Sequence, residues 1–541
     1  MDGQTIVNLY AQEVSQRENL DNQLQDISNF ITPGRNQYHS DMLSEHETNW
    51  TREHIYDNTA IVACKRLASF IHGSLTSPYI KWFSLLFRNE EMNTTPAFKE
   101  WLEDSEERMW KAYGESDLDN CAAEMYLDIA SIGTGFIMVE PGGELEWDGL
   151  DFTAMPVMDT YFDMGPDGMP YRAYRRIRYT KYELEKRFPD MPDEVQIDDE
   201  EASSIDAKIQ VIFCVYYRDK DAVGDQKVLK PEDRPVGYKY VMLNGGVELE
   251  EGGYYEWPVM VVRWDKMAGN KWGGSPGQDL LPNIMHLNEV VAQSSEAGLK
   301  AIDPPYVGTE RNVIGQLDLE PGGFTVVTDM DGLQPLLSAT DFAVVDNQVE
   351  RLQGSIERGF LIDQITYKNS PAMTATEVME RKQIMMQSAS TTLGRLKTDF
   401  LNPTVMIAFY MMLRQGQLLP PPEGMDITEL DVEYVSPMPR AQKADQAMGI
   451  EAWLNTMGEF FEMFPEMRDI VDVDNTVRRL AELRGVDAKL MHNEDEVKKT
   501  RAARAEQEQQ MQEAQNMAAG GQAMQEVGKG ATAMQEAGVE Q

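Results

Sequence analysis

The chain is long, strongly acidic and rich enough in apolar residues to fold. Its 541 residues include 91 acidic and 49 basic side chains, giving a formal net charge of −42, and 42% of them are hydrophobic. These values exclude a wholly disordered chain, and they disfavour a protein that grips DNA tightly, because most of its surface would repel a phosphate backbone.

The first 160 residues are expected to be largely helical. The clearest amphipathic run lies at 51–70, and Pro78 and the glycines at 142–143 interrupt the pattern. No run of 18 or more apolar residues occurs, and the first residues carry charges where a signal peptide would be apolar. We therefore expect no membrane segment and no secretion through a signal peptide.

Residues 149–262 predict a β-rich region. Short alternating segments such as 209–217 and 238–243 are separated by Pro and Gly turns. Within this region Thr180 and Glu183 have the spacing of a capping box, which predicts a short helix that ends near residue 188.

Two long helices with a β insertion between them are predicted for the middle of the chain. Ser275 is the expected N-cap of the first, which reaches Asp303 with a kink at Pro282 and would span roughly 42 Å. The segment 306–340 predicts strands and turns, and helical spacing returns at 341–363.

A small loop, 364–373, separates the second of these helices from a third. Thr374 and Glu377 have the spacing of another capping box, so a helix should begin at Ala375. Pro403 should break or bend that helix, because proline lacks a backbone N–H and clashes with the preceding turn.

The C-terminal part is expected to be one strand at 431–436 followed by helices. From about residue 493 the chain is rich in Gln, Ala, Met and Glu, and AMQEVG at 523–528 is followed by AMQEAG at 533–538. Such a tail has too little apolar bulk to pack alone, so it is either disordered or helical against neighbouring copies.

Residue patterns of enzymes and metal sites are nearly absent. The chain has no GxxxxGK[ST] phosphate loop, no HExxH motif and no CxxC spacing among its three cysteines. SIGTG at 131–135 is more typical of a turn than of a dinucleotide site, and the acids at 472–474 are more typical of a helix N-terminus than of a calcium loop. We predict no catalytic residue, no metal and no cofactor, and buried thiols in a reducing compartment.

Two blocks of opposite charge follow one another in the β-rich region. Seven basic residues lie between 172 and 187, and eight acidic residues lie between 190 and 206. The basic strand with its tyrosines is one candidate for contact with nucleic acid. The alternative is that the basic block of one copy meets the acidic block of a neighbour in a head-to-tail ring. The candidate interface residues are Arg172, Arg175, Arg176, Arg178, Asp198, Asp199, Glu200 and Glu201.

A series of short motifs keeps a fixed order over residues 263–442. They are RW at 263–264, WGGSPG at 272–277, LPNIMHLN at 281–288, PAMTATEV at 371–378, LRQG at 413–416, VSP at 435–437 and RAQ at 440–442. In this order they resemble the portal proteins, also called head-to-tail connecting proteins, of short-tailed bacteriophages. Gly274 departs from the family, which often has a basic or polar residue there.

The resemblance implies an α+β, mainly helical portal fold with a wing, a stem, a clip and a crown. In chain order the implied parts are a wing at 1–262 (β-rich from about 150), the wing-to-stem connection and first stem helix at 263–303, the clip at 304–340, the second stem helix at 341–363, the tunnel loop at 364–373, a long helix returning to the wing at 374–435, crown helices at 436–492 and a barrel-like or disordered tail at 493–541.

The resemblance also implies a ring, usually of twelve copies, at one capsid vertex. It implies a conduit for double-stranded DNA in packaging and ejection. The implied partners are the large terminase subunit, a tail adaptor, and capsid and scaffolding proteins. The implied location is the virion, after assembly in the host cytoplasm.

The loop at 364–373 is then expected to touch the DNA without gripping it, because Lys368 is its only charged residue. Its expected DNA-facing residues are Gln364, Thr366, Tyr367, Lys368, Asn369 and Ser370. Arg381 and Lys382 are the candidate basic groups near DNA, or else they pair with neighbouring glutamates.

Two other functions stay open on the sequence. A DNA-processing enzyme, such as a packaging motor or nuclease subunit, is disfavoured by the missing phosphate loop. An internal scaffolding protein of the virion is suggested only by the C-terminal repeat.

Overall fold

The structure, a computed structural model, falls into two compact units. Unit 1 comprises Met1–Leu86, Asp104–Pro421 and Leu430–Ser436, and unit 2 comprises Phe87–Glu103, Pro422–Glu429 and Pro437–Gln541. The residues that the structure describes are 1–33, 35, 53–89, 92–93, 95–143, 147–166, 168–189, 191–192, 209–219, 229–266, 269–302, 304, 306–308, 328, 333–335, 342–362, 394–434, 446–458, 472–484, 486, 496–507, 509 and 511.

Helices and strands are mixed, as an α+β fold requires. The helices are α1 (Gly3–Phe30), α3 (Thr59–Leu75), α5 (Pro96–Glu115), α6 (Leu118–Ser131), α7 (Lys181–Arg187), α9 (Pro276–Ile302), α10 (Phe342–Gly359), the π-helical turn η5 (Lys397–Leu401), α14 (Asn402–Arg414) and α16 (Val473–Arg484). The strands are β1 (Phe83–Phe87), β2 (Thr134–Pro141), β3 (Leu150–Met155), β4 (Thr160–Met164), β5 (Pro170–Tyr179), β6 (Ile209–Tyr217), β7 (Val236–Met242), β8 (Glu248–Tyr254), β9 (Val259–Arg263), β10 (Tyr306–Gly308), β11 (Leu333–Pro335) and β12 (Leu430–Tyr434).

The largest sheet has five antiparallel strands in the order β4-β5-β6-β7-β8. Its central strand β6 is buried on both faces from Val211 to Tyr216. Successive side chains of a strand point to opposite faces, so the apolar run of β6 supplies two hydrophobic layers at once.

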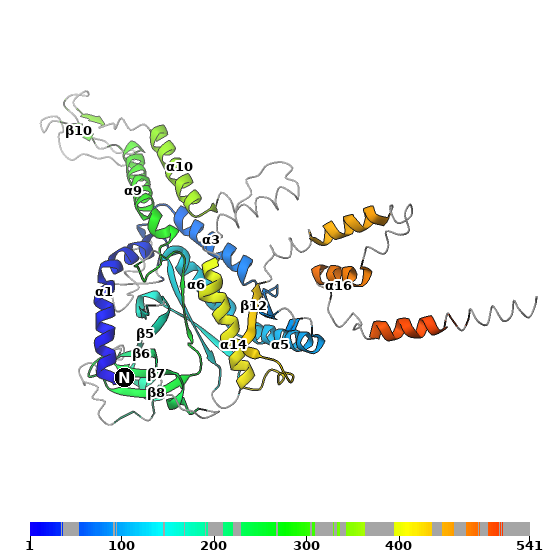
Figure 1. The fold of residues 1–541 in the computed structure, drawn as a ribbon. Helices are drawn as coiled ribbons and strands as arrows, with labels where there is room; N and C mark the ends of the chain where they lie inside the picture. Colours follow the sequence, from blue (N-terminus) through cyan, green and yellow to red (C-terminus); the bar gives the residue numbers. More distant parts are fainter. Residues whose placement is uncertain are drawn as a thin grey trace, which may run out of the picture. The chain divides into compact units, whose positions relative to one another are not determined.

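A helix covers each face of this sheet. Ile6 and Tyr10 of α1 pack on one layer, which includes Ile212 and Cys214, and α1 runs alongside the sheet in Figure 1. Leu184 of α7 packs on the other layer with Val211. The side chains of Thr180 and Glu183 form the predicted capping box, and α7 ends one residue before Phe188.

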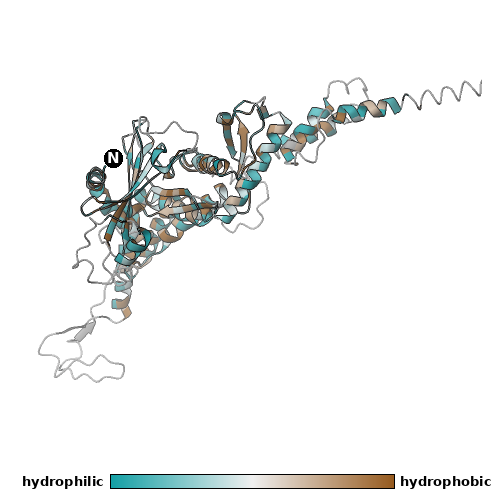
Figure 2. Cartoon of the chain, turned by 90° about the horizontal axis from the view of Figure 1, so that it is seen from below, coloured by the Kyte–Doolittle hydropathy of each residue, from teal (hydrophilic) through white to brown (hydrophobic). Residues whose placement is uncertain are grey.

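The second sheet has the order β3-β2-β9, and α6 packs against it. The thiol of Cys121 in α6 donates to the carbonyl of Phe152 in β3, at 3.1 Å. A Cβ added to Gly135 in β2 would lie 2.9 Å from Met125 of α6, so this glycine lets helix and strand approach closely. Hydrophilic and hydrophobic residues alternate along the helices (Figure 2), as expected of amphipathic helices.

The long helices α9 and α10 lie side by side in unit 1, with β10 beyond their ends (Figure 1). Strand β10 pairs antiparallel with β11, and both belong to the segment between the two helices. Between the two helices the structure describes only residues 304, 306–308, 328 and 333–335, so the predicted β insertion is otherwise outside the described residues. Helix α9 continues through Pro282, where a kink was expected.

In unit 2, α16 begins directly after Asp472. The Asp472 carboxylate accepts from the backbone N–H of Asn475 at 3.1 Å, so the acids at 472–474 start a helix as predicted. Arg484 at the end of α16 pairs with Glu451 at 2.6 Å, which joins two helical segments of this unit.

The first 160 residues, expected to be largely helical, contain α1, α3, α5 and α6 and also strands that were not expected. The strands β1, β2 and β3 lie there, and the helix expected from residue 51 is described as α3 only from Thr59. Most of β2 is the short apolar segment GFIMV, and a buried strand of this length cannot be told from a helix by periodicity. Among the described helices, none is long and apolar enough to cross a membrane.

One buried arginine fastens α1 to the start of β4. The Arg17 side chain is 2% exposed; its Nη1 donates to the carbonyls of Val157 (2.8 Å) and Thr160 (3.0 Å), and its Nη2 donates to that of Met158 (2.6 Å). Its guanidinium also stacks 3.8 Å from the ring centre of Tyr161. The five donors of arginine suit such a site, where lysine would satisfy fewer carbonyls.

Arg17→Met should therefore destabilise unit 1 by about 3–5 kcal/mol, because it removes the donor to three backbone carbonyls and the cation beside the Asp21 carboxylate. The measurement is the midpoint of thermal unfolding, together with amide hydrogen exchange in α1 and β4. The matched control is Arg66→Met on exposed α3 surface, which should change stability by less than about 0.5 kcal/mol. Equal effects of the two changes would contradict the role of Arg17.

Candidate functional site

Side-chain hydrogen bonds fix the first turn of α9, at residues 275–278, which we call the root of the helix pair. Ser275 Oγ accepts from the N–H of Gln278 (3.0 Å) and donates to the carbonyl of Ser131 at the end of α6 (2.7 Å). The Gln278 side chain donates to the carbonyl of Ile132 at 2.7 Å. Ser275, expected as the N-cap, thus caps α9 and also ties it to the neighbouring helix.

Two glycines let the backbone cross beside this cap. Gly133 has a φ of +94°, and a Cβ there would lie 2.5 Å from the carbonyl oxygen of Gly273. A Cβ on Gly273 would lie 2.1 Å from the carbonyl oxygen of Gly133. Both positions therefore require glycine, and the prediction of a turn with permissive backbone angles at 131–135 is confirmed.

Trp272 anchors the chain just before α9. Its ring is 7% exposed and meets Phe162 at 5.0 Å and Phe136 at 6.1 Å in edge-to-face arrangements. Such aromatic contacts add to the free energy of burial. The segment that leads into α9 is consequently fixed to the five-stranded and the three-stranded sheets.

Close and polar contacts hold α9 and α10 together. Gly359 of α10 approaches Leu280 so closely that an added Cβ would lie 2.5 Å from it. Nearer the middle of α9, His286 Nε2 and Gln348 Nε2 are 3.0 Å apart. The pair is thus packed at its base, where Leu280, Leu281, Ile284 and Leu287 are buried.

The far end of the pair is different. Leu299 is 68% exposed, Ile302 is 84% exposed, and Val344 of α10 is 63% exposed. Three large apolar side chains are thus exposed where α9 ends and α10 begins, which makes this end of the pair a candidate interaction surface.

A buried ion pair joins the end of β9 to η5. Arg263 Nη2 lies 3.3 Å from Asp399 Oδ2, and burial raises the pKa of the Asp399 carboxyl while Arg263 acts against that rise. The N–H of Asn402 bonds to the carbonyl of Lys397, five residues earlier, which defines the π-helical turn. The turn comes directly before Pro403, the residue expected to interrupt the helix.

The basic strand is mostly engaged within the chain. Arg172 pairs with Asp163 at 3.0 Å. Arg176 and Arg178 pair with Asp159 at 3.0 and 3.1 Å. Of the four predicted interface arginines, only Arg175 has no ion pair with a described residue. The predicted contact with a neighbour's acidic block stays a prediction.

The remaining predicted site residues lie outside the described part of the chain. They are the loop residues Gln364, Thr366, Tyr367, Lys368, Asn369 and Ser370, the basic residues Arg381 and Lys382, the capping pair Thr374 and Glu377, and the acidic residues Asp198, Asp199, Glu200 and Glu201.

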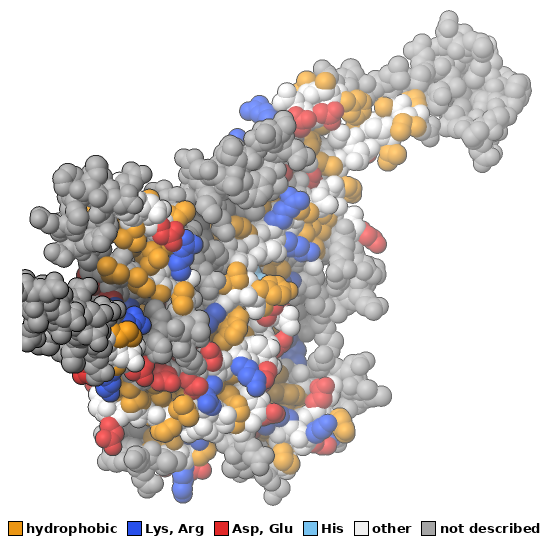
Figure 3. Space-filling model, turned by 90° about the vertical axis from the view of Figure 1, so that its right-hand side faces the viewer, with side chains coloured by type: hydrophobic (Ala, Val, Ile, Leu, Met, Phe, Trp, Pro, Cys, Tyr) orange, Lys and Arg blue, Asp and Glu red, His pale blue; other side chains and the backbone are white. Residues whose placement is uncertain are grey.

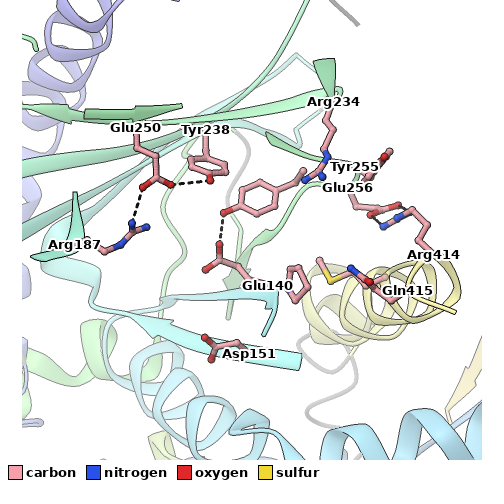
Figure 4. A pocket seen from close by; sticks show the side chains of 13 residues that line it. Glu140, Asp151, Arg187, Arg234, Tyr238, Glu250, Tyr255, Glu256, Arg414 and Gln415 are labelled. Atoms are coloured by element: carbon pink, nitrogen blue, oxygen red, sulfur yellow. Dashed lines mark hydrogen bonds and ion pairs between the residues drawn. The ribbon is translucent and has the colours of Figure 1, made fainter. Parts of the chain in front are cut away.

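A cavity of about 570 Å³ lies among β2, β8 and the end of α14 (Figure 4). Arg187 pairs with Glu250 at 2.7 Å, Arg414 pairs with Glu256, and Glu140 accepts a hydrogen bond from the Tyr254 hydroxyl. Burial raises the pKa of the Glu140 carboxyl. Most of these charged groups therefore bond to one another, and these contacts connect the elements around the cavity.

The described residues offer little chemistry. Within them, no group of three or more His, Cys, Asp or Glu could hold a metal ion. All three cysteines are buried, as predicted, and burial raises the pKa of Cys64 to about 12, so its thiol stays protonated and is a poor nucleophile.

Sequence reasoning missed the partners of the buried arginines. Arg263 was noticed only as part of a motif, and its partner Asp399 lies 136 residues away. The same holds for Arg17 and the carbonyls after β3. The available signal was a single arginine within an apolar segment, VMVVR at 259–263, since a buried charge requires a partner.

Comparison with known proteins places this geometry in a family. The family model described as "Bacteriophage head to tail connecting protein" matches residues 4–491. The portal protein of Salmonella phage epsilon15 is 25% identical over 517 residues, which cover 93% of this chain and 91% of that protein. The probable portal protein of Bordetella phage BPP-1 is 23% identical over 522 residues, which cover 94% of this chain and 92% of that one.

These matches cover the helix pair, its root, and the five-stranded and three-stranded sheets. They agree with the resemblance carried by the short motifs. The chain therefore belongs to the head to tail connecting, or portal, proteins of bacteriophages, which are structural proteins rather than enzymes.

Proposed function

We propose that copies of this chain form a ring at one vertex of a phage capsid and that double-stranded DNA passes through the ring during packaging and ejection. The family match supports this function. The structural observation that carries it is the helix pair α9 and α10, which is bonded firmly at its root and leaves apolar residues uncovered at its far end.

The helix pair has dimensions that suit a channel wall. Helix α9 has 27 residues and α10 has 18. At a rise of about 1.5 Å per residue, α9 is roughly 40 Å long. We assign these helices to the stem, and the segment between them to the clip.

Neighbouring copies would cover the exposed residues of the pair. Burying Leu299, Ile302 and Val344 against an adjacent pair removes apolar surface from water, at about 25 cal/mol per Å². In a head-to-tail ring every copy offers the same two surfaces, so one such contact repeated around the axis closes the ring. We propose twelve copies, on the resemblance stated above.

The charge of the chain favours passage of DNA over retention. The net charge is −42, and many basic side chains are paired within the chain. On the described part of the face in Figure 3, basic and acidic side chains are interspersed without a continuous basic strip. A duplex in the channel therefore meets few cations. Few contacts to phosphates then have to be broken as the DNA moves.

The other parts are assigned by the same resemblance. We propose that 1–262 is the wing, that 374–435 returns to it, and that 436–492 forms the crown. The clip would meet the large terminase subunit during packaging and the tail adaptor afterwards. Capsid and scaffolding proteins would contact the ring during assembly in the host cytoplasm, before it becomes part of the virion.

Electron microscopy of the purified protein tests the ring. We expect class averages with an open central channel, whereas filled particles or filaments would contradict a conduit. The double change Leu299→Glu and Ile302→Glu should shift the protein toward monomers in size-exclusion chromatography, because it places charges in the proposed apolar contact.

The control for this change is Ser295→Glu, which adds a negative charge at an exposed position of the same helix. It should leave the ring intact. If the double change also leaves the ring intact, with the helix content unaltered, then the far end of the pair is not a subunit contact.

The loop at 364–373 and the basic residues after it are proposed to face the DNA. Arg381→Ala with Lys382→Ala should reduce the retention of packaged DNA in assembled heads, because two cations near the phosphates are removed. The measurement is the fraction of heads that keep their DNA as the salt concentration rises. Retention equal to that of the unchanged protein at every salt concentration would exclude this role.

A further inference from the structure

A second pocket, of about 410 Å³, lies where β9 ends beside the π-helical turn η5. Its lining includes the side chains of Arg263, Lys266, Arg395 and Asp399. Three cations and one carboxylate therefore share one wall, in a chain whose acids outnumber its bases by 91 to 49. The pocket thus has a local surplus of positive charge on a strongly acidic protein, which makes it a candidate site for an anion.

Arg263 is only partly satisfied in this pocket. Its side chain is 4% exposed, and its Nε and Nη2 lie 3.4 and 3.3 Å from Asp399 Oδ2. Its Nη1 is buried and has no hydrogen-bond partner among the described residues. A buried guanidinium group that lacks an acceptor is costly, so the site is more stable with a further acceptor present.

Arg395 and Lys266, the other two cations of the pocket, could also donate to a further acceptor. Arg395 Nη1 lies 3.6 Å from Asp265 Oδ1, which is too far for a hydrogen bond, and Asp265 is 56% exposed to solvent. Lys266 makes no hydrogen bond or ion pair with any residue that the structure describes. The lining carries a surplus of two positive charges, and one remains when Asp265 at the rim is included.

Gly168 makes room for Lys266. It has a φ of +78°, and a Cβ at this position would lie 2.9 Å from Lys266 Nζ. A side chain at residue 168 would therefore displace the ammonium group from the pocket. Lys266 is half-buried, and its ammonium group lies close to the backbone of Gly168.

We propose that this pocket binds a phosphate group. A phosphate carries one or two negative charges, which match the surplus, and its oxygens can accept from several separate nitrogen donors. A free phosphate ion and a phosphate of a nucleic acid backbone share this chemistry. Binding of a free ion is independent of the function proposed above, whereas binding of a backbone phosphate rests on it.

Isothermal titration calorimetry of the full chain with inorganic phosphate, at constant ionic strength, tests the site. We expect saturable binding in the unchanged protein. The affinity should fall about tenfold in Lys266→Gln and about tenfold in Arg395→Gln, because each change removes one charged donor. Arg263 is left in place, since it also holds Asp399. The control is Lys181→Gln, an exposed lysine of α7 that removes the same charge elsewhere.

The double variant carries both Lys266→Gln and Arg395→Gln. The proposal is overturned if the unchanged protein does not bind phosphate, or if the double variant binds it equally well. A short DNA duplex separates the two sources. If the duplex competes with phosphate in the unchanged protein and fails to do so in the double variant, the site takes a backbone phosphate. If phosphate binds and the duplex does not compete, the site takes the free ion, and the conduit is tested separately by the ring images.

Discussion

The close crossing of Gly133 and Gly273 is the constraint on which the helix pair depends. Each residue lies against the carbonyl of the other, at distances where no Cβ fits. This approach brings Ser275 within hydrogen-bonding reach of Ser131, and so joins the first turn of α9 to the last residue of α6. A helix of 27 residues that is held mainly at one end needs such a base, because any looseness there is amplified along its length.

Short-range signals in the sequence were reliable, since they are complete within a few residues. Ser275 and Gln278 define one helix start, Thr180 and Glu183 another, and both are present as local hydrogen bonds. The α+β class followed from the same kind of signal, a change from helical to alternating spacing. The strand β2 was missed because its five central apolar residues fit a buried strand and a buried helix equally well.

Long-range pairing could not be predicted, because it depends on which strands become neighbours. The arginines of β5 looked free in the sequence, yet Asp159 and Asp163 reach them from β4 and the turn before it. Arg17 and Arg263 have partners more than 100 residues away. The same pairing bears on the net charge: several basic groups hold elements together within the chain and are not free cations on its surface.

The π-helical turn at Lys397–Leu401 also has a consequence for residue counting. An α-helix advances by about 100° per residue and closes its hydrogen bonds over four residues, whereas this turn closes over five and so accommodates one extra residue. Deleting one residue there would allow ordinary α-helical bonding with little rotation of the helix, because the extra residue is accommodated within the wide turn. The chain at this turn is therefore one residue longer than a continuous α-helix over the same span would need.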